Sequence, residues 1–262
     1  MKSSEVASAE QHQDSPTSTL IAKGIHAVEE AIDSGRPIDR IWMRTGLQNP
    51  RLSQLRRKAQ QANIPIAYVP QQKLRQWGKA HQGVVALLSP VHFVSWQEIV
   101  QHAYESGEHP LLLVCDRITD VRNFGAILRT AWIAGVHGVL IPQRHTAALN
   151  AEVVKASAGA LLHVSLCREA NLKKALGQLK NQGLLIAAAE AAHGIPPDQA
   201  PLNQPLALIV GSEGSGVHPQ LLQLADLRLT IPMRRPLNSY NVSAATAMLL
   251  YEVMRQRGQT LM

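Results

Sequence analysis

Three polar loops follow apolar runs that predict strands. Their sequences are DRITDVRNFGAILRT (116–130), VGSEGSGV (210–217) and IPMRRPLNSYNVSAAT (231–246). In an open parallel sheet, ligands bind outside the carboxyl ends of the strands. These three loops are therefore the first places in which to look for chemistry.

The first loop combines an amide, a glycine and an arginine. Asn123 can cap the helix that follows, and Gly125 allows a ligand or a backbone segment to approach closely. Arg129 lies about one and a half turns into that helix, on a different face from Leu128 and the other apolar residues. Its guanidinium is either an ordinary surface group or a grip for an anion.

The second and third loops supply glycines, a carboxylate and small polar groups. Gly211, Gly214 and Gly216 make a backbone-rich turn beside Glu213, but the spacing fits neither a P-loop nor the dinucleotide fingerprint. In the third loop, polar side chains crowd just before an apolar helix: Asn238, Ser239, Asn241 and Ser243. Taken singly, Ser239 or Asn241 is expected to be the N-cap of that helix.

The sequence lacks the usual metal and nucleophile templates. Its eleven histidines have no ligand spacing, and neither G-x-S-x-G nor H-E-x-x-H occurs. Cys115 and Cys167 each lie inside an apolar run, which is typical of buried thiols rather than of a disulfide or a zinc site. We therefore expect a site without a metal.

The elements that position these loops alternate along the second part of the chain. From residue 110 onward, apolar runs such as PLLLVCD, GVLIP, LLHVSL and PLALIVG alternate with helical segments. This alternation predicts an α/β fold with a mainly parallel sheet covered on both faces. Residues 19–92 predict a smaller α/β unit, with helices over residues 21–35 and 50–62. The acidic residues 93–109 predict a linking helix.

Composition and charge narrow the function classes. The chain has 262 residues, of which 45% are hydrophobic, and a net charge of +7, which fits a globular protein of one large or two modest domains. Residues 1–18 have acids, Ser and Gln where a signal peptide would need an apolar core, and they are expected to be a disordered tail. No apolar run approaches the roughly 20 residues that span a bilayer, so we expect a soluble, cytoplasmic protein.

The positive charge is concentrated in the first unit. From residue 40 to residue 97 there are nine Lys or Arg and no Asp or Glu. Because a solvated face normally mixes charges of both signs, this stretch is a candidate footprint for a polyanion such as RNA. The alternative is a basic surface that only aids solubility.

Three segments, taken in order, resemble the motifs of the SpoU family of RNA ribose 2′-O-methyltransferases. They are N-F-G-A-I-L-R-T-A, L-I-V-G-S-E-G-S-G and I-P-M…S-Y-N-V-S. The segments GIHAVEEAI and HQGVVALL resemble the substrate-binding domain of the branch that modifies a guanosine of large-subunit (23S) ribosomal RNA. The resemblance implies an RNA-binding domain over residues 19–92, a linker over 93–109 and a catalytic domain over 110–262.

The resemblance also implies a homodimer whose catalytic domain holds S-adenosylmethionine in a deep trefoil knot. It implies catalytic or RNA-facing roles for Asn123, Arg129, Glu213, Ser239 and Asn241. It implies contacts to the cofactor by Gly211, Ile231 and Tyr240. Arg129 would clamp a phosphate and stabilise the developing alkoxide, in its own or the neighbouring subunit, and Glu213 would fix Arg129 or the loop.

The chain also departs from the family pattern. Arg234, Arg235 and Pro236 stand where the family usually has a small residue, and Tyr240 stands where it has Leu. One alternative is therefore a non-catalytic RNA-binding protein of the same fold, and another is an enzyme that modifies tRNA. A nucleotide-dependent oxidoreductase is a further alternative, but the glycine-rich turn comes late in the chain and lacks an acidic ribose anchor after it.

Overall fold

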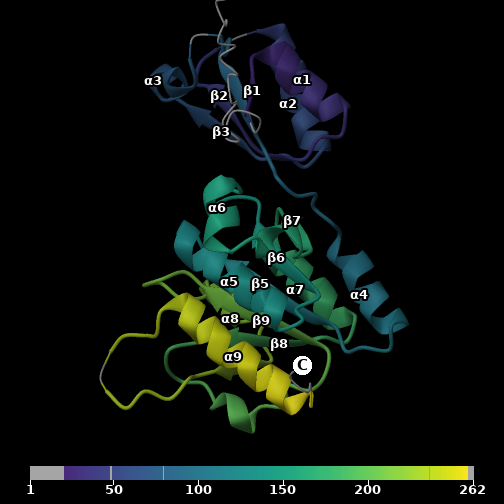
Figure 1. The fold of residues 1–262 in the computed structure, drawn as a ribbon, viewed down its shortest axis with the longest axis vertical. Helices are drawn as coiled ribbons and strands as arrows, with labels where there is room; N and C mark the ends of the chain where they lie inside the picture. The colour runs from purple at the N-terminus through teal and green to yellow at the C-terminus, as the bar shows by residue number, and fades with distance from the viewer. Residues whose placement is uncertain (1–20, 48, 79, 236, 259–262) are drawn as a thin grey trace, which may run out of the picture.

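The computed structural model describes residues 21–47, 49–78, 80–235 and 237–258, which form two α/β units around separate sheets (Figure 1). The expected tail, residues 1–18, lies outside the described residues, as do Lys79 and Pro236.

The N-terminal unit alternates short strands and helices. Its elements are β1 (Ile21–Lys23), α1 (Ile25–Asp33), β2 (Ile38–Arg44), α2 (Pro50–Gln61), β3 (Ile66–Val69), α3 (Gln71–Leu74), the 3-10 turn η2 (Arg75–Trp77) and β4 (Val84–Leu88). The strand order is β1-β4-β2-β3, with β4 antiparallel to β1 and β2, and β3 parallel to β2. The prediction of a helix over residues 21–35 is wrong for its first turn. Residues 21–23 form β1, which pairs with β4, and Gly24, at a φ of +91°, separates this strand from α1.

The C-terminal unit follows a longer alternation. Its elements are α4 (Trp96–Glu105), β5 (Leu111–Asp116), α5 (Val121–Ile133), β6 (Gly138–Pro142), α6 (Ala151–Ala156), η3 (Ala160–Leu162), β7 (Leu166–Glu169), α7 (Leu172–Asn181), β8 (Leu185–Ala189), η4 (Pro197–Gln199), β9 (Leu206–Gly211), α8 (Pro219–Leu222), β10 (Leu227–Leu229) and α9 (Val242–Gln256). The strand order is β10-β8-β9-β5-β6-β7, and each of these pairings is parallel. The predicted parallel sheet is confirmed.

One predicted strand of this unit is out of place. The apolar run LLHVSL predicts a strand, but its first two residues belong to η3 and the strand begins only at Leu166. The reason is Gly159, whose φ of +86° turns the chain into the 3-10 helix before it reaches the sheet.

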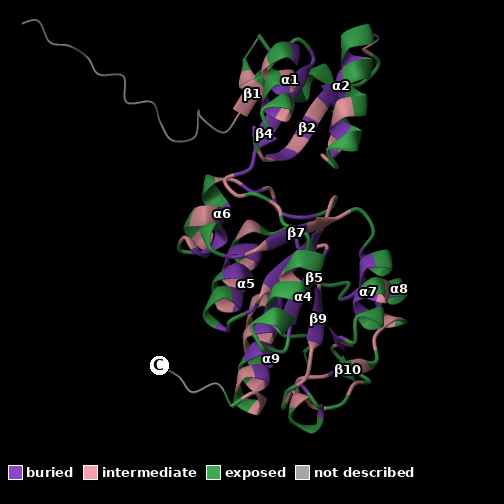
Figure 2. Ribbon diagram, turned by 90° about the vertical axis from the view of Figure 1, so that its right-hand side faces the viewer, coloured by how far each residue is buried: buried purple, intermediate pink, exposed green. Residues whose placement is uncertain are grey.

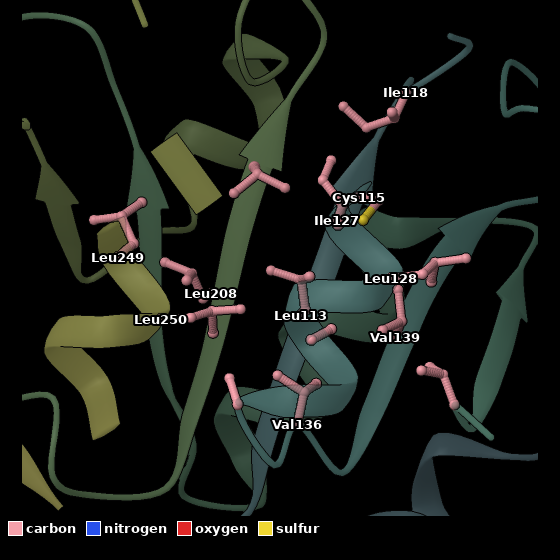
Figure 3. Packing of buried hydrophobic residues seen from close by; sticks show 14 of the residues in the cluster. Leu113, Cys115, Ile118, Ile127, Leu128, Val136, Val139, Leu208, Leu249 and Leu250 are labelled. Atoms are coloured by element: carbon pink, nitrogen blue, oxygen red, sulfur yellow. The ribbon is translucent and has the colours of Figure 1, made fainter. Parts of the chain in front are cut away.

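Helices cover both faces of the six-stranded sheet, and the buried strands run between them (Figure 2). Alternate residues of a strand point to opposite faces, so neighbours in sequence pack into different clusters. Leu113 and Leu208 face α5 and α9, where Leu128 and Leu250 are buried in the same cluster (Figure 3). Leu112, on the other face, belongs to a second cluster with α4 and α7.

The carboxyl ends of the parallel strands lie along one edge of this sheet. All three polar loops begin at that edge, after β5, β9 and β10. The fold therefore gathers the segments that the sequence singles out.

Candidate active site

The three loops meet in one hydrogen-bonded cluster of Asn123, Glu213 and Asn241. Asn123 Nδ2 donates to Glu213 Oε1 at 2.6 Å, and Asn241 Nδ2 donates to the same oxygen at 2.7 Å. Asn241 Nδ2 also lies 3.0 Å from Asn123 Oδ1. Each of the three loops thus contributes one of the predicted site residues to the cluster.

The starts of two helices hold these amides in place. Asp120 caps α5, because its Oδ1 accepts a hydrogen bond from Asn123 N at 2.8 Å. The expectation that Asn123 is the cap is therefore wrong, and its side chain reaches Glu213 instead. Asn241 does cap α9, with Oδ1 accepting from Ser243 N at 2.9 Å and from Ser243 Oγ at 2.6 Å. Since the cap uses Oδ1 and the cluster uses Nδ2, Asn241 serves both.

The glycine-rich loop folds back tightly on its own backbone. A Cβ atom at Gly211 would lie 2.1 Å from both the carbonyl carbon of Gly216 and the nitrogen of Val217. No side chain fits in that space, so a glycine is required at residue 211 for the loop to close. The closed loop presents Glu213 to the two amides.

Residues at the end of β5 form hydrogen bonds with the backbone at the end of the same loop. The buried Asp116 accepts a hydrogen bond from His218 N at 2.7 Å through Oδ2, and Arg117 donates to Gly216 O at 3.0 Å. Asp116 and Arg117 also form an ion pair, with 3.1 Å between Oδ2 and Nη2. This pair was not predicted from the sequence. The available signal was a carboxylate directly at the end of the apolar run LLLVC.

A cavity of about 400 Å³ lies beside the cluster, in the range of pockets that hold small molecules. The predicted site residues that line it are Gly211, Glu213, Ile231, Ser239 and Tyr240. Tyr240 braces the third loop by donating from its hydroxyl to Pro232 O at 3.1 Å. Another wall comes from residues 189–193, which were not predicted from the sequence and which include His193 at a φ of +64°.

Two residues of the first loop have other surroundings. Arg129 is exposed on α5, and it makes no hydrogen bond or ion pair with the other residues that the structure describes. Glu213 accepts from the two amides rather than from Arg129. Gly125 faces α6, since a Cβ there would lie 2.5 Å from Ala156 Cβ. This glycine allows helix packing rather than ligand approach.

The cluster and the cavity define what the arrangement can do chemically. Neutral amides held by one carboxylate orient a polar substrate group through hydrogen bonds, beside a cavity lined by both apolar side chains and polar groups. Within the described ranges, no group of three or more His, Cys, Asp or Glu side chains is placed to hold a metal ion. None of the described helices combines the length and the hydropathy that a membrane-spanning segment requires.

Comparison with known families accounts for both units. Residues 110–251 match the SpoU rRNA methylase family, and residues 21–94 match the family described as RNA 2′-O ribose methyltransferase substrate binding. The chain belongs to the SpoU rRNA methylase family.

Relatives of this SpoU family chain extend over nearly its full length. A protein of Staphylococcus haemolyticus, named as a TrmH family tRNA/rRNA methyltransferase, is 36% identical over 241 residues, which is 92% of this chain and 97% of the relative. The SpoU methyltransferase AviRb from Streptomyces viridochromogenes, solved with AdoMet, has a TM-score of 0.58 and 21% identity, and covers 95% of each chain. An AdoMet-bound rRNA methyltransferase from Sinorhizobium meliloti has a TM-score of 0.56 and 23% identity, over 90% of this chain and 87% of that one. The two solved structures show that the fold is shared.

Proposed function

We propose that this chain transfers a methyl group from S-adenosylmethionine to a ribose 2′-hydroxyl of RNA, with a guanosine of 23S ribosomal RNA as the target. The observation that carries the proposal is the Asn123–Glu213–Asn241 cluster beside the cavity. It combines the two things that the reaction needs: groups that orient a hydroxyl, and an adjoining pocket for the methyl donor.

The cavity fits the methyl donor in both size and chemistry. Its walls include apolar side chains such as Leu229, Ile231 and Met233, and backbone from the glycine-rich loop, which suit a flat base and a short polar chain. Gly211, Ile231 and Tyr240 are the residues that we propose to contact it. Bound there, S-adenosylmethionine supplies a methyl group on a sulfonium sulfur.

The residues of the cluster act by positioning the ribose. The 2′-oxygen forms a bond to the methyl carbon as the carbon–sulfur bond breaks, the thioether product leaves with the bonding electron pair, and the hydroxyl proton passes to water. Correct placement of that oxygen can lower the barrier by about 7 kcal/mol. Asn123 and Asn241 orient the reacting groups, Glu213 fixes the two amides, and Ser239 adds a hydroxyl at the cavity wall.

Arg129 is proposed to clamp a phosphate and stabilise the developing alkoxide in the site of a second subunit. It lies three and four residues before Trp132 and Ile133, and so on the same face of α5. Both apolar side chains are exposed, as are Met248 and Tyr251 on the neighbouring α9. A second copy packed on these side chains would also lie against Arg129. We therefore propose a homodimer through α5 and α9, in which Arg129 of one subunit serves the site of the other. Sedimentation of an Ile133→Glu variant should show a monomer.

The finer architecture is proposed on the same basis. Residues 19–92 form the RNA-binding domain, 93–109 the linker and 110–262 the catalytic domain, in a cytoplasmic enzyme. A trefoil knot would involve the segment between β10, which is an outermost strand of the sheet, and α9, which packs on α5 and β9. The packing of α9 on central elements of the unit supports such a path.

The decisive experiment is methyl transfer with purified components. The protein is incubated with labelled S-adenosylmethionine and either 23S rRNA or tRNA, and the digested RNA is analysed by mass spectrometry. We expect 2′-O-methylguanosine in the 23S rRNA. A label on tRNA only would favour the tRNA alternative. That alternative is consistent with the name of the Staphylococcus relative, which includes both tRNA and rRNA. A label on a base, or no transfer to any RNA, would overturn the proposal.

A further inference from the structure

The two units are joined by a buried ion pair that the proposed reaction does not use. Arg168, near the end of β7, donates from Nη2 to Asp39 Oδ1 at 2.7 Å, and Asp39 lies on β2 of the N-terminal unit. The side chains of Arg168 and Asp39 are only 6% and 1% exposed. A charge pair buried this deeply between two units fixes their relative orientation only if its geometry is held by further contacts.

Further contacts surround this pair on both sides. Arg168 Nη1 donates to Ile38 O at 2.9 Å, and its guanidinium carbon lies 3.7 Å from the centre of the Phe93 ring. Arg40 donates from Nε to the other oxygen of Asp39 at 2.8 Å and from Nη2 to Thr146 O at 3.4 Å. The carboxylate of Asp39 is thus shared between one arginine from each unit.

The connecting segment is held at both ends. Ser89 N donates to Pro37 O at 2.8 Å in the N-terminal unit, and Val94 N donates to Leu166 O at 2.9 Å in the C-terminal unit. The few residues between these two anchors leave little freedom for the units to swing. A contact nearer the surface, from Gln143 Nε2 to Asn63 O at 2.7 Å, joins them as well.

The contacts between the two units lie at the carboxyl ends of the parallel strands. Arg168 is the next-to-last residue of the parallel strand β7, and Gln143 and Thr146 follow the end of β6, so all three lie at the carboxyl ends of the strands, where the candidate active site is built. Figure 1 shows the N-terminal unit seated at the end of the C-terminal unit that carries α6 and β7. The acid-free stretch of the N-terminal unit is therefore held at the same edge as the Asn123–Glu213–Asn241 cluster.

The charge and the burial of Arg168 indicate how this junction contributes to the fold. Burial lowers the pKa of Arg168 to about 10, although the Asp39 carboxylate opposes that shift, so Arg168 stays charged at neutral pH. Arg168 Nε and Thr146 Oγ1 are buried without a hydrogen-bond partner among the described residues. Because desolvation offsets much of the attraction in such pairs, the net stability that this pair adds is small, which leaves selection of one arrangement of the two units as the role to test.

We propose that Asp39 and Arg168 are positioning residues that lock the RNA-binding domain at the active-site edge and so set where the target nucleotide enters. This proposal rests on the proposed function, since it takes the N-terminal unit to bind the RNA and the C-terminal unit to methylate it.

The structural arm of the test measures the distance between the units. Exposed Gln72 on α3 and Lys173 on α7 are replaced by cysteine and spin-labelled, while the buried Cys115 and Cys167 stay unlabelled. The full-length protein should give one narrow distance distribution, Asp39→Asn and Arg168→Met should give broad ones, and Arg168→Lys should be intermediate. Lys180→Met, which removes an ion pair with Asp226 inside the C-terminal unit, is the matched control and should stay narrow. A narrow distribution in Asp39→Asn and Arg168→Met would overturn the lock.

The kinetic arm separates positioning from folding. When the units hold the RNA-binding arrangement for only a fraction of the time, the apparent affinity for RNA falls by that fraction, so we expect the KM for RNA to rise about tenfold or more in Asp39→Asn and Arg168→Met. The kcat at saturating RNA and the affinity for S-adenosylmethionine should be unchanged, and Arg168→Lys should restore part of the KM. Loss of cofactor affinity in these variants, or an unchanged KM, would overturn the positioning role. If the parent protein methylates no RNA, the proposed function fails, while the distance measurement still decides whether the lock exists.

Discussion

Asn241 and Asn123 are 118 residues apart in sequence, yet Asn241 Nδ2 donates to Asn123 Oδ1 at 3.0 Å. Each lies in the first turn or at the cap of a helix that packs on the same face of the central sheet. Bringing the starts of α5 and α9 together is therefore what creates the cluster. Glu213 completes it from a third loop.

Two substitutions at Asn241 separate its roles. Asn241→Ser keeps a good N-cap but removes the amide donor, so stability should change by less than about 0.5 kcal/mol while methyl transfer falls sharply. Asn241→Ala should lose the activity and also about 1 kcal/mol of stability. Thermal unfolding and initial rates measured side by side check this, and a fully active Asn241→Ser would remove the amide from the mechanism.

Gly211→Ala should disable the glycine-rich loop. The new Cβ would lie 2.1 Å from the backbone of Gly216 and Val217, so the loop has to open and Glu213 has to leave the two amides. We expect calorimetry to show weak or no binding of S-adenosylmethionine. Gly214→Ala is a useful comparison, since no described residue other than its two chain neighbours comes within 4 Å of its Cβ position, although its φ of +84° adds some strain. Equal affinity in Gly211→Ala and the parent would contradict the closed-loop geometry.

Arg129→Ala should lower turnover by about 10² to 10³, the scale for loss of one group that stabilises a developing oxyanion. Its stability should change by no more than about 0.5 kcal/mol, because the side chain is exposed. Arg129→Lys should rescue only part of the turnover, since lysine keeps the charge but lacks the planar two-pronged grip.

Mixing two inactive variants tests whether Arg129 acts across a dimer. If it does, Arg129→Ala and Asn123→Ala subunits combined in equal amounts should recover about a quarter of the sites, because half of the dimers are mixed and each has one complete site. Absence of recovery, with subunit exchange verified, would place Arg129 in its own subunit's site.

The basic helix α2 should contribute to RNA affinity through its exposed arginines. Replacing Arg56 and Arg57 by Ala should weaken RNA binding and reduce the slope of log affinity against log salt by about 1 for each phosphate that is no longer neutralised. Lys58→Ala is the matched control, because Lys58 Nζ is already paired with Asp33 at 2.7 Å and its removal should matter less. The same slope in all three proteins would mark α2 as a solvated face.

The two cysteines predict an alkaline limit to stability. Burial, with a smaller effect of nearby carboxylates, raises the pKa of Cys115 and of Cys167 to about 12 from an ordinary value of 9.0. The folded state holds these protons longer than the unfolded state, so the contribution is complete below pH 9 and is lost as the pH rises to about 12. Cys115→Ala should therefore show a shallower fall of unfolding free energy over that range in denaturant titrations. An identical pH slope would contradict the burial of this thiol.

The sequence predicted an element correctly where its residue pattern fits only one kind of secondary structure. Buried parallel strands read as apolar runs, and so residues 111–116, 138–142 and 206–211 were predictable, as was the edge at which the loops meet. Strand β7 was misplaced because an apolar run such as LLHVSL fits a buried turn as well as a strand. The site residues Asn123, Glu213 and Asn241 were singled out, but not their shared hydrogen bonds, since these depend on side-chain direction.

Contacts between distant parts of the chain were the least predictable. Nothing around Asp39 or Arg168 in the sequence indicates that the two charges meet, because the pairing depends on how two separately folded units dock. The same limit applies to Asp116, whose partner His218 lies 102 residues away.

The bridge between Phe93 and Leu166 has a consequence for solubility. Strand β7 is at the end of the strand order, and an open strand at the end of a sheet offers unpaired backbone groups to any other extended chain. Residues 93 and 94 occupy part of that position, with Val94 N already donating to Leu166 O. The segment that connects the two units thereby also shields the start of β7 from strand addition by another molecule, which guards the protein against aggregation through this edge.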